Sequence, residues 1–267
     1  MARVALHFWE EPPISGTKGS GTVFFTGCSL GCIFCQNQEI SRGENRGKSL
    51  SPQELSDLFF ELVEQGAHNI NLVTPTHFAV EIAKALRLQK LPVPVVYNCG
   101  GYESPETLAQ LKGLVDIYLP DFKYADNDLA ARLSAASDYR EVALAAVAEM
   151  RAQQPENIFD AAGILQKGVI IRHLILPLHT KNSIAVLNLI KNQFPTTPVS
   201  LMAQYTPVGE KIQKYPELCR PITKRELQKV TDEMLRLNLD GYIQSRKSVG
   251  ESFIPDFNQF KALNERN

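Results

Sequence analysis

Six short apolar segments, each followed by a segment with helical periodicity, constrain the fold of this chain most strongly. The segments lie at 22–27, 69–73, 94–97, 115–119, 168–176 and 199–203, and a further short strand is expected at 241–245. They are continuously apolar rather than alternating, which is typical of strands buried on both faces of a parallel sheet. Six βα units are fewer than the eight of a closed TIM barrel. The sequence therefore predicts an α/β fold with an open, partial (β/α)6 TIM-type barrel.

The helices between these strands are expected at 51–66, 78–89, from 104 onward, 126–136, 139–153, 181–194 and 223–237. The first of them has clear end signals. Ser51 is a candidate N-cap, Pro52 stands at the first helical position and Glu54 completes a capping box, while Gly66 can end the helix with a left-handed conformation.

Length and composition indicate one large domain without an unusual partner. The chain has 267 residues, is 44% hydrophobic and carries a formal net charge of -1, so neither nucleic acid nor an anionic membrane surface is an expected partner. No apolar run approaches the roughly 20 residues of a membrane span, and the first residues do not resemble a signal peptide, so a cytoplasmic protein is expected. We expect an N-terminal arm at 1–20, a core domain at 21–250 and a C-terminal extension at 251–267.

Three of the five cysteines lie within eight residues, in the pattern Cys28-x3-Cys32-x2-Cys35. In a reducing compartment, such crowding favours metal binding over disulfides, and thiolates suit iron–sulfur clusters or zinc. Three ligands leave one coordination position open, which allows a metal to activate a substrate, whereas structural sites are usually closed. Gly27 and Gly31 allow a tight backbone path around the metal. A zinc site completed by a distant residue is the structural alternative.

The loop from Cys28 to Asn37, with Phe34 just before the last cysteine and SGTKGSGTVFFTG before it, resembles the signature loop of the radical S-adenosylmethionine (SAM) superfamily. Within that superfamily it is most similar to pyruvate formate-lyase activating enzyme homologues. The resemblance implies that Cys28, Cys32 and Cys35 hold a [4Fe–4S] cluster whose fourth iron binds SAM. It implies reductive cleavage of SAM to a 5′-deoxyadenosyl radical that abstracts hydrogen from a peptide or small-molecule substrate, a reaction that includes the activation of glycyl radical enzymes. A low-potential electron donor such as flavodoxin or ferredoxin is the implied partner.

Residues at the ends of the later strands are the expected cofactor-binding residues, because the ends of parallel strands meet at one face of a barrel. By this reasoning and by the resemblance, the expected cofactor-binding residues are Phe34, Thr74, Thr76, Asn98, Asp121, Lys123, Arg172 and Gln204. Asp121 and Lys123 match a family segment that borders SAM, and Arg172 matches an arginine near SAM. The ordinary alternatives are a capping carboxylate for Asp121 and a solvated charge for Lys123. His173, on the opposite face of its strand from Arg172, is expected to be structural.

Three segments depart from the family pattern. Thr74-Pro75-Thr76 replaces a Gly-Gly-Glu turn that receives the SAM amino group, so backbone carbonyls and threonine hydroxyls would have to accept its hydrogens; an ordinary turn is an equal alternative. Asn98 stands where the family has an acid, which removes one negative charge. Gln204 begins a segment that has lost the histidine of the activases.

The N-terminal arm contains the only tryptophan, Trp9, and two adjacent glutamates, Glu10 and Glu11. Covering the edge of the sheet without contacting a ligand is the favoured role for this arm, and covering the open mouth of the barrel is the alternative.

A second functional class stays open at this stage, namely a non-enzymatic iron–sulfur or zinc-binding protein. A ferredoxin-like carrier would normally close its cluster with four protein ligands, and a small metal module would not need six βα units. The sequence therefore favours an enzyme.

Overall fold

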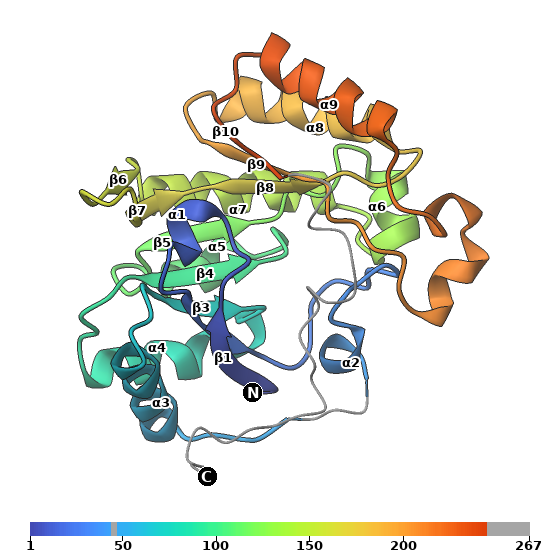
Figure 1. The fold of residues 1–267 in the computed structure, drawn as a ribbon. Coiled ribbons are helices and arrows are strands. Elements are labelled where there is room, and N and C mark those ends of the chain that lie inside the picture. The colour runs from blue at the N-terminus through green and yellow to red at the C-terminus, as the bar shows by residue number, and fades with distance from the viewer. Residues whose placement is uncertain (44–46, 245–267) are drawn as a thin grey trace.

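The computed structural model describes residues 1–43 and 47–244, which form a curved, mostly parallel sheet with helices on its outer side (Figure 1). The parallel strands are β2 (Ser20–Phe24), β3 (Ile70–Val73), β4 (Val95–Cys99), β5 (Ile117–Pro120), β7 (Leu165–Val169), β8 (Ile171–Leu174), β9 (Val199–Met202) and β10 (Gly241–Ile243). The predicted partial barrel of βα units is confirmed.

The predicted strand 168–176 is divided between β7 and β8, because the backbone changes its hydrogen-bonding partner there. The N–H of Ile170 donates to Tyr118 of β5, whereas the N–H of the next residue, Ile171, donates to Pro198 just before β9. A parallel bridge between Asp121 and Arg172 links β5 to β8 across this change. The strands described thus form a seven-stranded sheet and a three-stranded sheet, and this bridge joins the two where β7 passes into β8.

The helices of the outer layer are α3 (Pro52–Glu64), α4 (Ala79–Leu88), α5 (Pro105–Ala109), α6 (Asn127–Ser134), α7 (Tyr139–Gln153), α8 (Thr180–Gln193) and α9 (Lys224–Arg236). Helices α3 and α4 pack together at one end of the sheet, and α8 and α9 pack together at the other (Figure 1). Short helix α1 (Pro12–Ser15) packs against the sheet, where its Ile14 belongs to a buried cluster with strand residues such as Val96 and Ile117. Short helix α2 (Gln38–Ser41) follows the cysteine loop. None of the helices described is long and apolar enough to cross a membrane.

The predicted capping box of α3 is present. The hydroxyl of Ser51 accepts from the N–H of Glu54 at 3.2 Å, and the Glu54 carboxylate accepts from the N–H of Ser51 at 2.8 Å. A second box, formed by Thr223 and Glu226, begins α9. These local signals explain why the helix starts could be predicted closely.

Two strands were not predicted. Residues Arg3–His7 form β1, which pairs antiparallel with β2, so the expected irregular arm is partly a regular edge strand. Its apolar residues Val4, Ala5 and Leu6 pair with β2 through the backbone, which a pattern based on buried parallel strands does not detect. The second is β6 (Ile158–Phe159), an exposed two-residue strand paired antiparallel with β7. The expected boundary at 250/251, the extension at 251–267 and residue 245 of the last expected strand lie outside the described residues.

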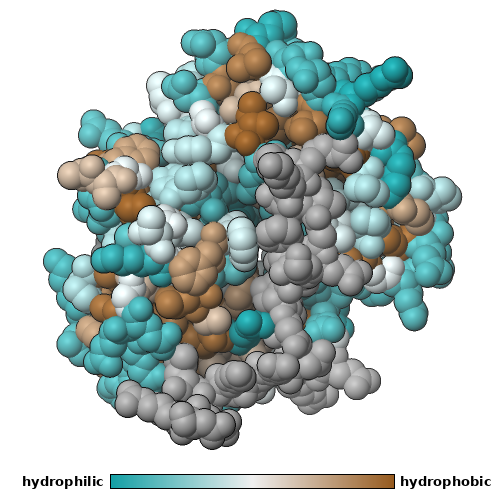
Figure 2. All heavy atoms as spheres, viewed as in Figure 1, coloured by the Kyte–Doolittle hydropathy of each residue, from teal (hydrophilic) through white to brown (hydrophobic). Residues whose placement is uncertain are grey.

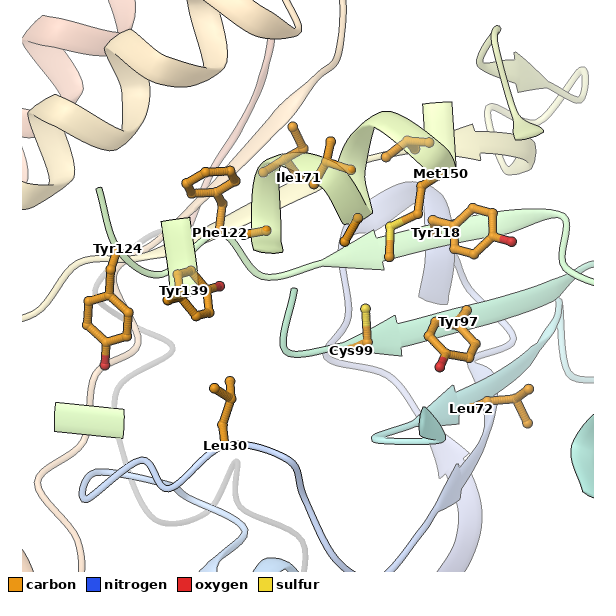
Figure 3. Packing of buried hydrophobic residues seen from close by; sticks show 14 of the residues in the cluster. Leu30, Leu72, Tyr97, Cys99, Tyr118, Phe122, Tyr124, Tyr139, Met150 and Ile171 are labelled. Carbon is orange, nitrogen blue, oxygen red and sulfur yellow. The ribbon is translucent and has the colours of Figure 1, made fainter. Parts of the chain in front are cut away.

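The main core lies between the sheet and its outer helices. Tyr97 of β4 and Tyr118 of β5 are fully buried with their rings 6.0 Å apart, and Figure 3 shows them near Met150 of α7. Leu30, in the loop that carries the cysteines, belongs to the same cluster. The loop is therefore anchored to the core by packing. On the surface shown in Figure 2, hydrophilic residues predominate.

Tyr139 of α7 fixes the backbone at the ends of β4 and β5. Its buried hydroxyl accepts from the N–H of Lys123 at 2.9 Å, and it lies 2.7 Å from the carbonyl oxygen of Asp121 and 2.9 Å from that of Gly100. A core side chain thus determines where two candidate site residues lie.

We expect Tyr139→Phe to lower the free energy of unfolding by about 1–3 kcal/mol, because it leaves a buried N–H and a buried carbonyl without partners. Urea denaturation measures the change. Tyr102→Phe is the matched control, since the Tyr102 hydroxyl bonds to Asp138 at the surface. Equal losses of stability in Tyr139→Phe and Tyr102→Phe would contradict a special role of the buried Tyr139 hydroxyl in fixing the backbone after β4 and β5.

Candidate cofactor site

A cavity of about 240 Å³ opens where the strands end. Its walls include all of the predicted site residues except Thr76, namely Cys28, Cys32, Phe34, Cys35, Thr74, Asn98, Asp121, Lys123, Arg172 and Gln204. These residues come from the loop after β2 and from the ends of β3, β4, β5, β8 and β9. The structure therefore brings the cysteine loop and the predicted strand-end residues together in one place.

The cysteine loop is held by the carboxyl end of α6. The N–H of Gly31 donates to the carbonyl of Ser134 at 2.8 Å, and the N–H of Ile33 donates to that of Leu133 at 2.9 Å. The Ser134 hydroxyl also donates to the sulfur of Cys32 at 3.0 Å. The last carbonyls of a helix lack intrahelical partners, so this helix end is well suited to bind a loop.

Gly31 lies in a crowded place beside the end of the Arg42 side chain and Ala135. A Cβ at this position would lie 2.5 Å from the guanidinium of Arg42 and 3.1 Å from the Cβ of Ala135. Gly27 has φ +82°, a left-handed conformation that favours glycine. The predicted role of Gly27 thus has a structural reason.

The three cysteines fit the ligand set of an iron–sulfur cluster with one open iron. Cys28, Cys32 and Cys35 are free thiols, each half-buried, and all three face the same cavity. Burial raises the pKa of Cys32 to about 11, so ligation at this sulfur must displace a proton. Within residues 1–43 and 47–244, no three His, Cys, Asp or Glu side chains converge as the ligands of a single metal ion would.

The cavity is also lined by a network of charged and amide side chains centred on Arg172. Its Nε donates to Asp121 Oδ1 at 2.9 Å, its Nη2 donates to Asn98 Oδ1 at 2.6 Å, and its Nη1 pairs with Glu10 Oε2 at 3.2 Å. Lys123 forms an ion pair with the other oxygen of Asp121. Each of these charges therefore has an opposite charge beside it.

Charge pairing fixes the ionisation of this network. Burial alone would raise the pKa of Asp121, but Arg172 and Lys123 outweigh it and hold that pKa below its ordinary value. Burial likewise opposes the charge of Lys123, yet Asp121 raises the pKa of this lysine above its ordinary value. Both side chains are thus charged at neutral pH, and neither is a solvated surface charge.

Thr74 and Thr76, the two threonines of the altered turn, lie in different environments. Thr74 faces the cavity with φ +56°, a left-handed conformation that is uncommon for a threonine and that occurs often at functional sites. The Thr76 hydroxyl instead donates to Glu103 Oε1 at 3.1 Å and accepts from the Tyr97 hydroxyl at 3.2 Å. Thr76 therefore lies behind the cavity wall, with its side chain already engaged.

Three further residues named from the sequence have clear positions. Phe34 packs edge-on against Tyr205, whose hydroxyl donates to the Leu218 carbonyl, so Tyr205 has a packing role. His173 is fully buried with Nδ1 2.7 Å from the Phe122 carbonyl oxygen, which confirms the structural interpretation. The Gln204 carbonyl accepts from Gln36 and so ties the cysteine loop to the end of β9.

The sequence did not place His7, Trp9 and Glu10 in the site, yet all three line the cavity. The arm covers the edge of β2 through β1, as favoured, and it also reaches the barrel opening. The feature of the sequence that could have indicated this role of the arm was the pair of glutamates beside the only tryptophan, which is an unusual composition for a plain edge strand.

Glu103 provides a test of the polar layer behind the cavity. Burial raises its pKa to about 7, although hydrogen bonds from Cys99 and Thr76 oppose this shift. Because the folded pKa is raised above the ordinary value of 4.5, protonation favours the fold. This contribution is fully present below about pH 4.5 and is lost as the pH rises through about 7.

We therefore expect Glu103→Gln to be more stable than the original protein at about pH 8, and expect that advantage to shrink at about pH 5. Between these two pH values, the stability advantage of Glu103→Gln should change by about 3 kcal/mol, which is the free-energy equivalent of the pKa shift. Urea denaturation at both pH values measures it, with the exposed Glu64→Gln as control. A stability difference between Glu103→Gln and the original protein that is the same at both pH values would contradict the raised pKa of Glu103.

Residues 22–177 match the family model of the radical SAM superfamily, and the chain therefore belongs to that superfamily. An uncharacterized protein of Methanocaldococcus jannaschii is 30% identical over 244 residues, which cover 88% of this chain and 67% of the relative.

Two solved structures show the same fold. One is SuiB of Streptococcus suis bound to the precursor peptide SuiA, which superposes with a TM-score of 0.56 at 14% identity. The match covers 84% of this chain and 48% of SuiB. The other is methylornithine synthase PylB, which superposes with a TM-score of 0.58 at 14% identity. This match covers 92% of this chain and 77% of PylB. The chain thus spans about half of SuiB and three quarters of PylB.

Membership in the superfamily identifies the cofactors as a [4Fe–4S] cluster and SAM. Members of the superfamily are enzymes that cleave SAM reductively and need a reductant, so the class of non-enzymatic metal-binding proteins is set aside. The cysteines at the cavity have the donor chemistry that such a cluster requires.

Proposed function

We propose that this enzyme abstracts a hydrogen atom from a peptide or small-molecule substrate at the cavity described above. The observation that carries the proposal is that the three cysteines and the network of Asp121, Lys123 and Arg172 line a single cavity. When bound, the reduced cluster and SAM supply one-electron cleavage of SAM to methionine and a 5′-deoxyadenosyl radical. The residues of the chain then have to bind, orient and exclude water.

The roles of the side chains follow from their chemistry. Cys28, Cys32 and Cys35 would hold three irons as thiolates and leave the fourth iron to SAM. Asp121 and Lys123, whose charges are fixed by pairing, would present an acceptor and a donor to the polar groups of SAM. Phe34 supplies an apolar wall beside the cysteines and is 6% exposed. Thr74 and Asn98 would complete the polar boundary.

Activation of a glycyl radical enzyme is the specific form of this function that the cysteine loop supports, because the loop resembles that of the pyruvate formate-lyase activating enzymes. In that case the substrate is a polypeptide glycine. A low-potential flavodoxin or ferredoxin would supply the electron in either case.

We expect that replacing Cys28, Cys32 or Cys35 with Ala abolishes both the four-iron cluster and SAM cleavage, because each variant retains only two of the three ligands. Iron and sulfide analysis after anaerobic reconstitution measures the first effect. 5′-Deoxyadenosine formed with dithionite and SAM measures the second. Cys219→Ala should change neither, since Cys219 is exposed and does not line the cavity. A full cluster in Cys32→Ala would refute the assignment.

The substrate class can be tested by deuterium transfer. A fully deuterated cell extract is separated into polypeptide and small-molecule pools, and each pool is incubated with the reconstituted enzyme, dithionite and SAM. We expect deuterium in 5′-deoxyadenosine from one pool, and transfer from the polypeptide pool supports the activase form. Cleavage of SAM without deuterium transfer from either pool would contradict hydrogen abstraction as the function.

A further inference from the structure

The segment between β1 and α1 inserts the Glu10 side chain into the barrel opening. The turn is fixed by Ser15, whose hydroxyl accepts from the Glu10 N–H at 3.0 Å and lies 3.2 Å from the His7 carbonyl oxygen. The Glu10 side chain is 10% exposed and lines the cavity. Its position is therefore defined by local backbone structure as well as by its partners.

Glu10 connects three strands of the barrel. Its Oε1 accepts from Asn71 of β3 at 3.0 Å and from Asn98 of β4 at 3.2 Å, while Oε2 pairs with Arg172 of β8 at 3.2 Å. Arg172 is only 13% exposed. A nearly buried carboxylate with this many partners is a well-satisfied site rather than an accidental contact.

The contacts of Glu10 determine the orientation of other site residues. The guanidinium of Arg172 binds Glu10, Asp121 and Asn98 through three different nitrogens. The amide of Asn98 is fixed at both ends, because it accepts from Arg172 and donates to Glu10. Loss of the Glu10 charge would therefore release Arg172 and Asn98 together, and with them the alignment of Asp121.

Buried ion pairs contribute little net stability compared with apolar packing, so the fold alone does not require this arrangement. The neighbouring residue shows the contrast. Glu11 is 1% exposed, and in the described part of the chain its carboxylate oxygens make no hydrogen bond. Two adjacent glutamates thus share burial, and the charge of Arg172 acts on both, but only Glu10 forms hydrogen bonds with cavity residues. Comparing the two glutamates therefore isolates the effect of these hydrogen bonds.

We propose that Glu10 is a positioning residue of the SAM site: through Arg172 and Asn98 it makes the N-terminal arm part of that site. The arm precedes residues 22–177, which match the superfamily model. The inference rests on the proposed function, because it takes the cavity to be the place where SAM binds.

The test compares Glu10→Gln with Glu11→Gln in reconstituted protein. Gln keeps the shape of the side chain but turns a neutral amide toward Arg172. We expect the Kd for SAM, measured by anaerobic calorimetry, to rise about tenfold in Glu10→Gln and to stay within about twofold in Glu11→Gln, with equal iron content in both. Glu10→Asp, which keeps the charge, should recover part of the affinity.

A second readout uses cluster-free protein. Trp9 is the only tryptophan, lines the cavity and precedes Glu10, so its fluorescence reports the position of the arm. We expect acrylamide to quench Trp9 more strongly in Glu10→Gln than in Glu11→Gln, because the arm loses its attachment. Far-UV circular dichroism shows whether a variant has unfolded, because Trp9 is already 60% exposed in the folded protein.

The outcomes separate the two hypotheses. Equal SAM affinity and equal quenching in the two variants would overturn the role of Glu10 while SAM cleavage by the original protein upholds the proposed function. Reconstituted original protein that neither binds nor cleaves SAM would overturn the proposed function itself. A loss of iron in Glu10→Gln alone would also overturn the inference, because it would place Glu10 in cluster retention rather than in SAM binding.

Discussion

The site depends on the ion pair between Arg172 and Asp121. A guanidinium in an apolar strand carries a large desolvation cost, and the chain offsets it with acceptors from β4, β5 and the N-terminal arm. The same pair lies at the bridge where the sheet passes from β5 to β8. One interaction thus joins two halves of the barrel and sets the charges of the cavity wall, so the geometry of the fold and that of the site cannot vary independently.

Local sequence signals predicted what depends on nearby residues. The capping box of α3, the start of α9 at Thr223, the apolar strands and the spacing of the cysteines all act within a few positions of the chain, and each was found. Arg172 was selected because it matches a family arginine near SAM. That its ion-pair partner is Asp121 was not evident, because the strand order that brings the two residues together is a property of the whole barrel.

The contacts that the sequence could not reveal span long stretches of chain. Glu10 and Arg172 are 162 positions apart. Strand β1 pairs antiparallel with β2, and its sequence lacks the continuous apolar pattern by which the parallel strands were predicted. Thr76 was expected at the cofactor, but a buried carboxylate, Glu103, engages its hydroxyl from the loop after β4. Asn98 stands where the resemblance has an acid, and here a carboxylate comes from the arm instead. In this arrangement a carboxylate lies near Asn98 but comes from a distant part of the chain, so the sequence around Asn98 does not reveal it.

The attachment of the cysteine loop to the end of α6 has a consequence for biosynthesis. Cys32 and Ser134 are 102 positions apart, so a chain emerging from the ribosome presents its three cysteines long before the helix that shapes their loop has been made. During that interval the Cys32 thiol lacks its hydrogen bond from Ser134, and the loop lacks its backbone bonds to Leu133 and Ser134. These contacts of the loop can form only after β5 and α6 have been synthesised.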